Sequence, residues 1–210
     1  MHSSFNITNF HQLCDVLALA DADLARVINT YGYPPLWSRP NTFETLVHII
    51  LEQQVSLASA LSALNRLKEK TGNLSPENLL LLTDDDMRAC YCSRQKTSYI
   101  RHLAEAICNN TIHLQDLENQ EHEQVRKQLT ALKGIGNWTA DVYLMFVLQH
   151  PDIFPIGDLA AVNGLRRIKN LDPKTSKEDL LQIVNQYQPY RTLATMIIWH
   201  YYLSERKKIV

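Results

Sequence analysis

The chain has 210 residues, 45% of them hydrophobic, and a formal net charge of −1. This composition supports a folded core and excludes a broadly basic protein that coats nucleic acid along its whole surface. No apolar run reaches the roughly 18 residues needed to span a bilayer, and the first residues lack a signal-peptide pattern. We therefore expect a soluble, intracellular protein with no membrane partner.

Charged residues are distributed unevenly between the two ends of the chain. Residues 1–60 carry two basic residues against five acidic ones, whereas residues 161–210 carry nine basic against four acidic. A basic C-terminal part permits a local phosphate-binding face without a high overall charge. A solvated helix surface is the alternative interpretation.

Helical periodicity dominates the chain from residue 43 onward. Apolar residues recur at steps of three and four over 43–67, after an N-cap at Asn41 or Thr42. Short helices are expected after Ser75 and Thr83. No segment shows the alternation of a strand, so an all-α fold is predicted. Further helices are expected over 94–108, 121–132, 139–149, 158–169, 176–187 and 190–206.

Cysteine and histidine give no sign of a metal site. The four cysteines follow neither disulfide nor zinc-ligand spacing, so we expect reduced thiols. The histidines have no mutual spacing that suggests ligation and are interpreted as core or surface residues. The cysteines are Cys14, Cys90, Cys92 and Cys108, and the histidines considered are His48, His102, His122 and His200.

The most informative segment is LKGIGNWTA, residues 132–140. A helix is expected to end near Leu132, and Gly134 and Gly136 to form a tight turn before a new helix that starts by Trp138. The free amides and positive dipole end of that helix suit an anion such as a DNA phosphate. Taken alone, the pattern also fits an ordinary helical hairpin capped by glycine.

A second break, FPIGD, ends in Asp158, which is expected at the start of a helix. Alone, it is interpreted as an N-cap. Together, however, LKGIGNWTADVYLMFVLQHPDIFPIGDLAAVNGLRRI closely resembles the helix-hairpin-helix and Gly/Pro-loop–aspartate signature of the HhH-GPD DNA glycosylase superfamily. IILEQQVSLASA, SRQKTSYIRHLA and YQPYRTLATMIIWHYYL resemble its 3-methyladenine DNA glycosylase II branch. The resemblance covers roughly residues 36–205, in order.

The resemblance implies two helical lobes with the active site in the cleft between them. Residues 1–42 would begin one lobe, 43–155 would form the central lobe that ends in the hairpin, and 156–210 would complete the first lobe. In the family the aspartate is the catalytic carboxylate, here Asp158. Bifunctional members place a lysine nucleophile where this chain has Trp138, so a monofunctional enzyme without lyase activity is implied.

Other roles also follow from the resemblance. Trp138, Trp199 and Tyr143 would line the base pocket, with Val142 departing from relatives that have tyrosine there. Trp37 and Tyr33 are interpreted as core residues, or else as neighbours of the cleft mouth. Gln54 would be the wedge that fills the gap left by the flipped nucleotide, and the hairpin residues Gly134, Gly136 and Thr139 would bind DNA.

The resemblance implies no required cofactor. Main-chain carbonyls of Thr130, Leu132 and Gly134 would hold a structural monovalent cation at the hairpin. An iron–sulfur cluster is not expected, because the last cysteine is Cys108 and the cluster needs four near the C-terminus. The expected protein is a monomer that acts on damaged duplex DNA, in the cytoplasm at the nucleoid, or in the nucleus of a eukaryote.

The expected activity is hydrolytic release of alkylated purines such as 3-methyladenine, after base flipping, in base excision repair. One alternative keeps the family and changes the base to uracil, thymine or mismatched adenine. Another is a helix-hairpin-helix module that binds DNA without catalysis, and the last is a helical scaffold with no DNA affinity. The base preference among 3-methyladenine, 7-methylguanine, hypoxanthine and ethenopurines is left open.

Overall fold

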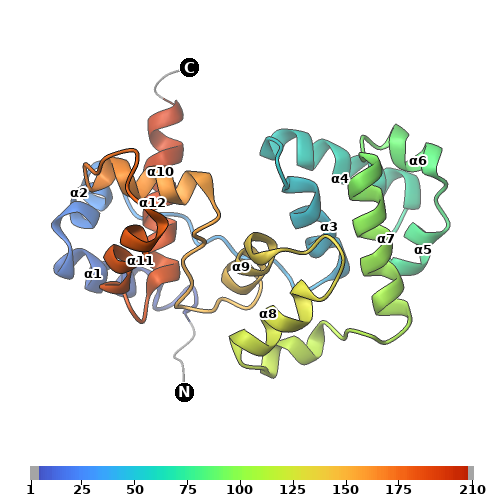
Figure 1. The fold of residues 1–210 in the computed structure, drawn as a ribbon, viewed down its shortest axis with the longest axis horizontal. Helices are drawn as coiled ribbons and strands as arrows, with labels where there is room; N and C mark the ends of the chain where they lie inside the picture. Colours follow the sequence, from blue (N-terminus) through green and yellow to red (C-terminus); the bar gives the residue numbers. More distant parts are fainter. Residues whose placement is uncertain (1–4, 208–210) are drawn as a thin grey trace. The chain divides into compact units, whose positions relative to one another are not determined.

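The computed structural model describes residues 5–207, and its regular elements in that range are helices only (Figure 1). The predicted all-α fold is confirmed. The chain divides into two compact units: unit 1 takes the residues up to Ser38 and those from Gln149 on, and unit 2 takes Arg39–Leu148. These boundaries fall a few residues before positions 42 and 155, where the sequence placed them.

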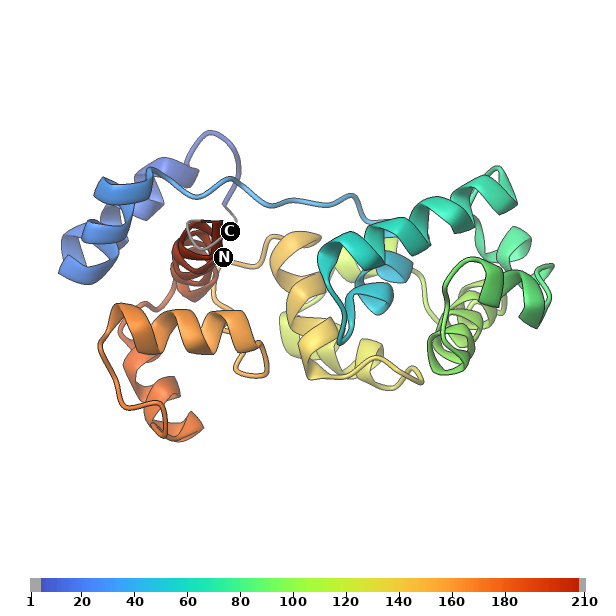
Figure 2. The same ribbon diagram turned by 90° about the horizontal axis from the view of Figure 1, so that it is seen from above.

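Unit 1 is built around α12 (Arg191–Lys207), whose residues 192–198 are all buried. A helix that is buried on every side needs partners on several faces. Figure 2 shows α12 end-on, with the N-terminal helices on one side and the remaining C-terminal helices on another. The helices that contact α12 are α1 (Phe10–Ala20), α2 (Ala22–Tyr31) and α10 (Leu159–Ile168). The unit is completed by α11 (Lys177–Asn185).

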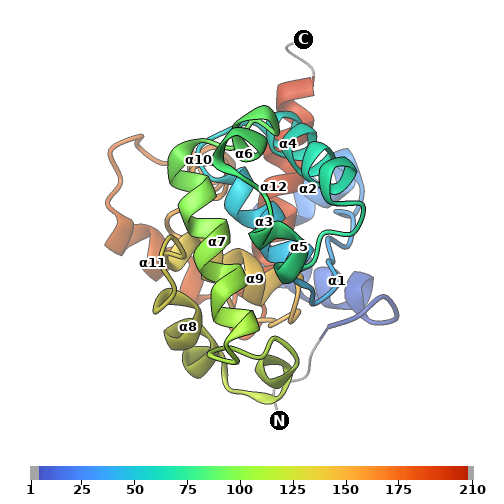
Figure 3. The same ribbon diagram turned by 90° about the vertical axis from the view of Figure 1, so that its right-hand side faces the viewer.

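Unit 2 is centred on α9 (Asn137–Phe146) and α3 (Phe43–Glu52), which contact each other. Residues 139–146 of α9 are all buried, as are most of α3. In Figure 3, α7 (Arg94–Cys108) runs across α3. The unit is completed by α4 (Leu57–Thr71), α5 (Pro76–Leu80), α6 (Asp84–Ala89), the 3-10 helix η1 (Gln115–Asn119) and α8 (His122–Thr130).

The periodic segment 43–67 is two helices rather than one. Thr42 caps α3 by accepting a hydrogen bond from the amide of Thr45, and Ser56 caps α4 in the same way through Ser59. Between them, residues 53–56 form a turn in which Gln54 has a φ of 58°. Apolar periodicity alone did not reveal the break, because the spacing of apolar residues continues across it.

None of the helices in residues 5–207 combines the length and the apolar character that crossing a membrane requires. Over the same range, no three His, Cys, Asp or Glu side chains cluster in a way that could hold a metal ion.

Candidate active site

Asp158 lies at the N-terminus of α10 in unit 1, half-buried. Its Oδ1 accepts a hydrogen bond from the amide of Ala161 at 2.8 Å and another from Nε1 of Trp199 at 2.9 Å. The N-cap expected from the sequence is therefore present, and the carboxylate has a second donor from a distant helix. Two donors on one oxygen fix the plane of the carboxylate, which a cap alone would leave free to rotate.

A close approach of two helices brings Trp199 to Asp158. A Cβ added to Gly164 of α10 would lie 2.6 Å from Cγ2 of Ile198 on α12, which is inside van der Waals contact. Only glycine allows α10 to pack at this distance. Because Ile198 precedes Trp199, this packing sets the distance from the indole to the start of α10.

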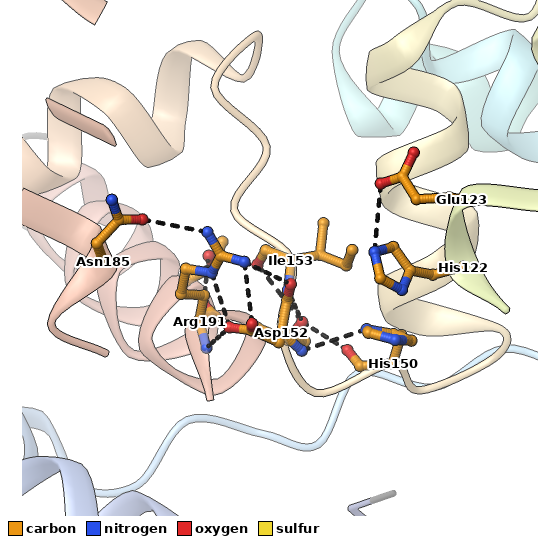
Figure 4. Close-up of polar contacts among 9 residues, drawn as sticks. His122, Glu123, His150, Asp152, Ile153, Asn185 and Arg191 are labelled. Atoms are coloured by element: carbon orange, nitrogen blue, oxygen red, sulfur yellow. Dashed lines mark hydrogen bonds and ion pairs between the residues drawn. The ribbon is translucent and has the colours of Figure 1, made fainter. Parts of the chain in front are cut away.

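The loop that leads to Asp158 is also attached to α12 (Figure 4). The Asp152 carboxylate accepts two hydrogen bonds from the Arg191 guanidinium, at 2.7 and 2.9 Å, and the amide of Ile153 donates to the Thr192 hydroxyl at 3.0 Å. A bidentate pair of this kind fixes direction as well as distance. The loop 152–158 is thus held at both ends, by Arg191 near the start of α12 and by Trp199 two turns later.

Trp37 is half-buried and packs edge-on against Trp199, with ring centroids 6.2 Å apart and an interplanar angle of 83°. This is a favoured aromatic geometry. Trp37 therefore supports the Trp199 indole that binds Asp158. The sequence left two interpretations of Trp37 open, a core residue or a neighbour of the cleft mouth, and its observed role combines packing with proximity to Asp158. Tyr33 instead donates to Asp15 at 2.6 Å.

The hairpin lies in unit 2, between α8 and α9. Gly134 has a φ of +88°, and a Cβ there would lie 2.0 Å from the ring of Tyr99 on α7. Glycine is required at this position for both backbone conformation and space. Gly136 has an ordinary φ of −96° and nothing near its missing Cβ. Only one of the two glycines is thus required by its geometry.

The N-terminus of α9 is open. Its N-cap, Gly136, provides no side-chain hydrogen bond, and both Gly136 and Asn137 are exposed. No side chain caps this first turn, and the positive end of the helix dipole lies behind it, an arrangement that suits an anion. Trp138 follows in this first turn, half-exposed.

Two residues that the sequence placed in contact with ligands are buried. Tyr143 is fully buried and its hydroxyl donates to Oδ1 of Asn41 at 2.5 Å, while burial raises its pKa. Thr139 is 2% exposed, and its hydroxyl accepts a hydrogen bond from Gln53. These positions argue against Tyr143 as a pocket wall and Thr139 as a DNA contact, because both side chains are committed to the interior of unit 2.

Gln54, the expected wedge, is exposed at the turn between α3 and α4. Its left-handed backbone is unfavourable for a side chain with a Cβ and persists only where the surroundings impose it. The neighbouring Gln53 donates from Nε2 to the carbonyl of Gly134 at 2.9 Å and to Thr139 at 3.0 Å. The family resemblance singled out Gln54 and assigned no role to Gln53. In the structure Gln54 is exposed, whereas Gln53 binds the hairpin.

Two basic side chains of the C-terminal part form ion pairs within unit 1. Lys169 pairs with Asp21 and Asp23, and Arg191 with Asp152. Burial would raise the pKa of Asp21, but hydrogen bonds from Lys169 and Tyr187 outweigh it and hold that pKa below its ordinary value. Part of the charge asymmetry between the chain ends is therefore taken up by pairing inside unit 1.

Cations outside ion pairs also occur beside the hairpin in unit 2. A hollow of about 540 Å³ lies there, lined by residues of α6, α7 and the hairpin. Among its lining residues, Arg94 and Lys133 are exposed and form no ion pair within residues 5–207, whereas Arg101 pairs with Asp84. Basic side chains next to open helix amides are suited to phosphate groups.

An all-helical fold that contains a glycine hairpin with open amides, followed by an aspartate held by an indole, defines a helix-hairpin-helix protein of the DNA-repair class. The chain belongs to the HhH-GPD superfamily of base excision DNA repair proteins, whose family model matches residues 47–189.

Known proteins resemble the chain over most of its length. A DNA-3-methyladenine glycosidase from Bacillus halodurans is 30% identical, with a TM-score of 0.77 over 91% of this chain and 89% of that one. Schizosaccharomyces pombe Mag1, a 3-methyladenine DNA glycosylase solved with abasic DNA, is 29% identical, with a TM-score of 0.83 over 90% and 95%. YfjP of Bacillus subtilis is 27% identical over 84% of this chain, which spans 64% of YfjP.

Proposed function

We propose that the chain is a monofunctional DNA N-glycosylase that excises alkylated purines of the 3-methyladenine type from duplex DNA. The observation that carries this proposal is the Asp158 carboxylate, which Trp199 and the Ala161 amide hold in a fixed orientation. The similarity to 3-methyladenine glycosylases supports the choice of substrate class.

A fixed carboxylate suits the chemistry of glycosidic cleavage. When the bond between the base and C1′ breaks, its electron pair leaves with the base and positive charge develops on the sugar. Asp158 would stabilise that charge, and water would then add to C1′ and lose a proton. Because the donors to Asp158 are already in place, no reorganisation of the carboxylate is needed during the reaction.

Trp138 and Trp199 would select a cationic leaving group. An N-alkylated purine carries positive charge, and an indole face attracts it by stacking and by cation–π interaction. Trp138 also stands where lyase members of the family carry an amine nucleophile. Lys133 lies in the hairpin, exposed beside a hollow lined by α7, which suits contact with phosphate rather than attack at C1′.

The hairpin would hold the DNA backbone. The open amides at the start of α9 would bind one phosphate, and Arg94 and Lys133 would bind its neighbours. Gln54 would enter the stack where the damaged nucleotide has flipped out. This arrangement places phosphate contacts on α7 and the hairpin.

A monovalent cation at the hairpin fits the carbonyls that would hold it. The Leu132 carbonyl accepts the amide of Ile135 at 3.1 Å, and the Gly134 carbonyl accepts Gln53 at 2.9 Å. A carbonyl oxygen has two lone pairs, so each retains one for a cation, together with Thr130. A bound cation would supply positive charge beside the phosphate-binding amides.

The test is a mass-spectrometric survey of the bases that the purified protein releases from alkylated duplex DNA, beside duplexes that contain uracil or mismatched adenine. The proposal predicts free 3-alkyladenine, with little or no uracil or adenine. Release of uracil or adenine alone would assign another substrate to the same site. Binding of DNA with no base released from any substrate would show a module without catalysis.

A further inference from the structure

Contacts with other elements hold the turn between α3 and α4 in place, although the turn itself has no regular secondary structure. Gln53 uses both hydrogens of its amide nitrogen, one on the Gly134 carbonyl at 2.9 Å and one on the Thr139 hydroxyl at 3.0 Å. Thr139 is buried in α9, and the backbone of Gly134 is held under the ring of Tyr99. Gln53 is therefore anchored to two rigid points of the hairpin.

The residues on either side of this turn are fixed as well. Nζ of Lys96, on α7, donates to the Leu51 carbonyl at 2.5 Å, which satisfies one of the free acceptors at the end of α3. Ser56 caps the start of α4 through the amide of Ser59 at 3.2 Å. Between these attachments the exposed Gln54 adopts its left-handed conformation.

We propose that Gln53 is a positioning residue that ties Gln54, the residue entering the DNA stack, to the phosphate-binding hairpin. The inference rests on the proposed function. With the contact intact, a phosphate bound at the start of α9 fixes where Gln54 meets the duplex. Ordering the turn in advance removes the entropy cost of ordering it when the nucleotide flips.

The contact requires an amide at position 53. Gly134 offers a carbonyl oxygen, which can only accept, so the partner must donate. A glutamate of the same length would place a second acceptor against that carbonyl and could not replace the glutamine. Thr139→Val keeps the shape of the side chain but removes one of the two acceptors, so it tests the same contact from the hairpin side.

The experiment measures single-turnover excision of one alkylpurine in two settings, a regular base pair and a single-nucleotide bulge where stacking is already lost. Gln53→Ala and Gln53→Glu should slow excision from the regular pair about tenfold, the expected effect of losing two neutral hydrogen bonds. Excision from the bulge should stay within about twofold of wild type, because little stacking remains to be replaced. Gln124→Ala, at an exposed glutamine on α8, is the matched control and should change neither rate.

Equal losses on both substrates, or no loss on either, would overturn the positioning role while leaving the glycosylase assignment intact. If wild type releases no base from either substrate, the proposed function fails, and the inference fails with it. Should Gln53→Ala not fold, Thr139→Val carries the same prediction, and Thr139→Ser should restore wild-type rates.

Discussion

The two hairpin glycines should respond in different ways to the same substitution. Gly134→Ala forces a Cβ into a backbone with a φ of +88°, which costs about 1–2 kcal/mol for an L-residue. The new methyl group would also lie 2.0 Å from Cγ of Tyr99. Overpacking of this kind adds about 1–3 kcal/mol, because the half-buried Tyr99 ring must move away from the hairpin backbone.

Gly136→Ala lacks both penalties. Its φ is −96° and no atom lies within 4 Å of the added Cβ. Loss of a favourable N-cap glycine is offset by the reduced freedom of the unfolded chain, so the net change should stay within about 1 kcal/mol.

Thermal unfolding monitored by circular dichroism measures this difference. At about 2–4 °C per kcal/mol for a chain of this size, Gly134→Ala should lower the Tm by at least about 4 °C, and Gly136→Ala should leave it within about 4 °C of wild type. The double variant Gly134→Ala with Tyr99→Ala separates backbone strain from the clash. Similar Tm values for the two glycine variants would refute the hairpin geometry and the close approach of Tyr99.

Two further predictions concern what the protein does to DNA. After base release the strand should stay uncut, and borohydride should trap no covalent adduct, because Trp138 offers no amine; trapping that is lost on Lys133→Ala would identify a lyase instead. Duplex affinity should fall with salt along a log–log slope of about −2 to −5, and the double variant Arg94→Ala with Lys133→Ala should flatten that slope by about 1.8. Lys68→Ala, whose cation pairs with Glu44, should leave the slope unchanged, and an unchanged slope in the double variant would remove α7 from the docking surface.

The elements that depend on local chemistry were predictable from the sequence. Helix starts at Thr42, Ser75 and Thr83 have the expected capping hydrogen bonds, and the special backbone of Gly134 was expected from its place between two helices. These features depend on residues within one turn of each other. Asp158 likewise was expected at a helix start, where it caps α10.

Contacts between distant segments were not predictable. Tyr99 lies 35 residues before Gly134 along the chain, and no local pattern indicates that its ring covers the glycine. Tyr143 was expected at a pocket because some relatives have a tyrosine at the neighbouring position, here Val142, but the packing of α9 buries Tyr143. The charge of the C-terminal part was visible in the composition, whereas its pairing with Asp21 and Asp23 depends on tertiary structure.

The most direct test of the central claim is the rate of base release by Asp158→Asn. Asparagine still caps a helix and still offers Trp199 an acceptor oxygen, so the fold of unit 1 should be retained. Release of 3-methyladenine from duplex DNA under single-turnover conditions should fall by a factor on the order of 10² or more, because the negative charge opposite C1′ is gone. Affinity for abasic-site DNA should stay near wild type. Excision by Asp158→Asn at close to the wild-type rate would contradict the assignment of Asp158 as the catalytic carboxylate.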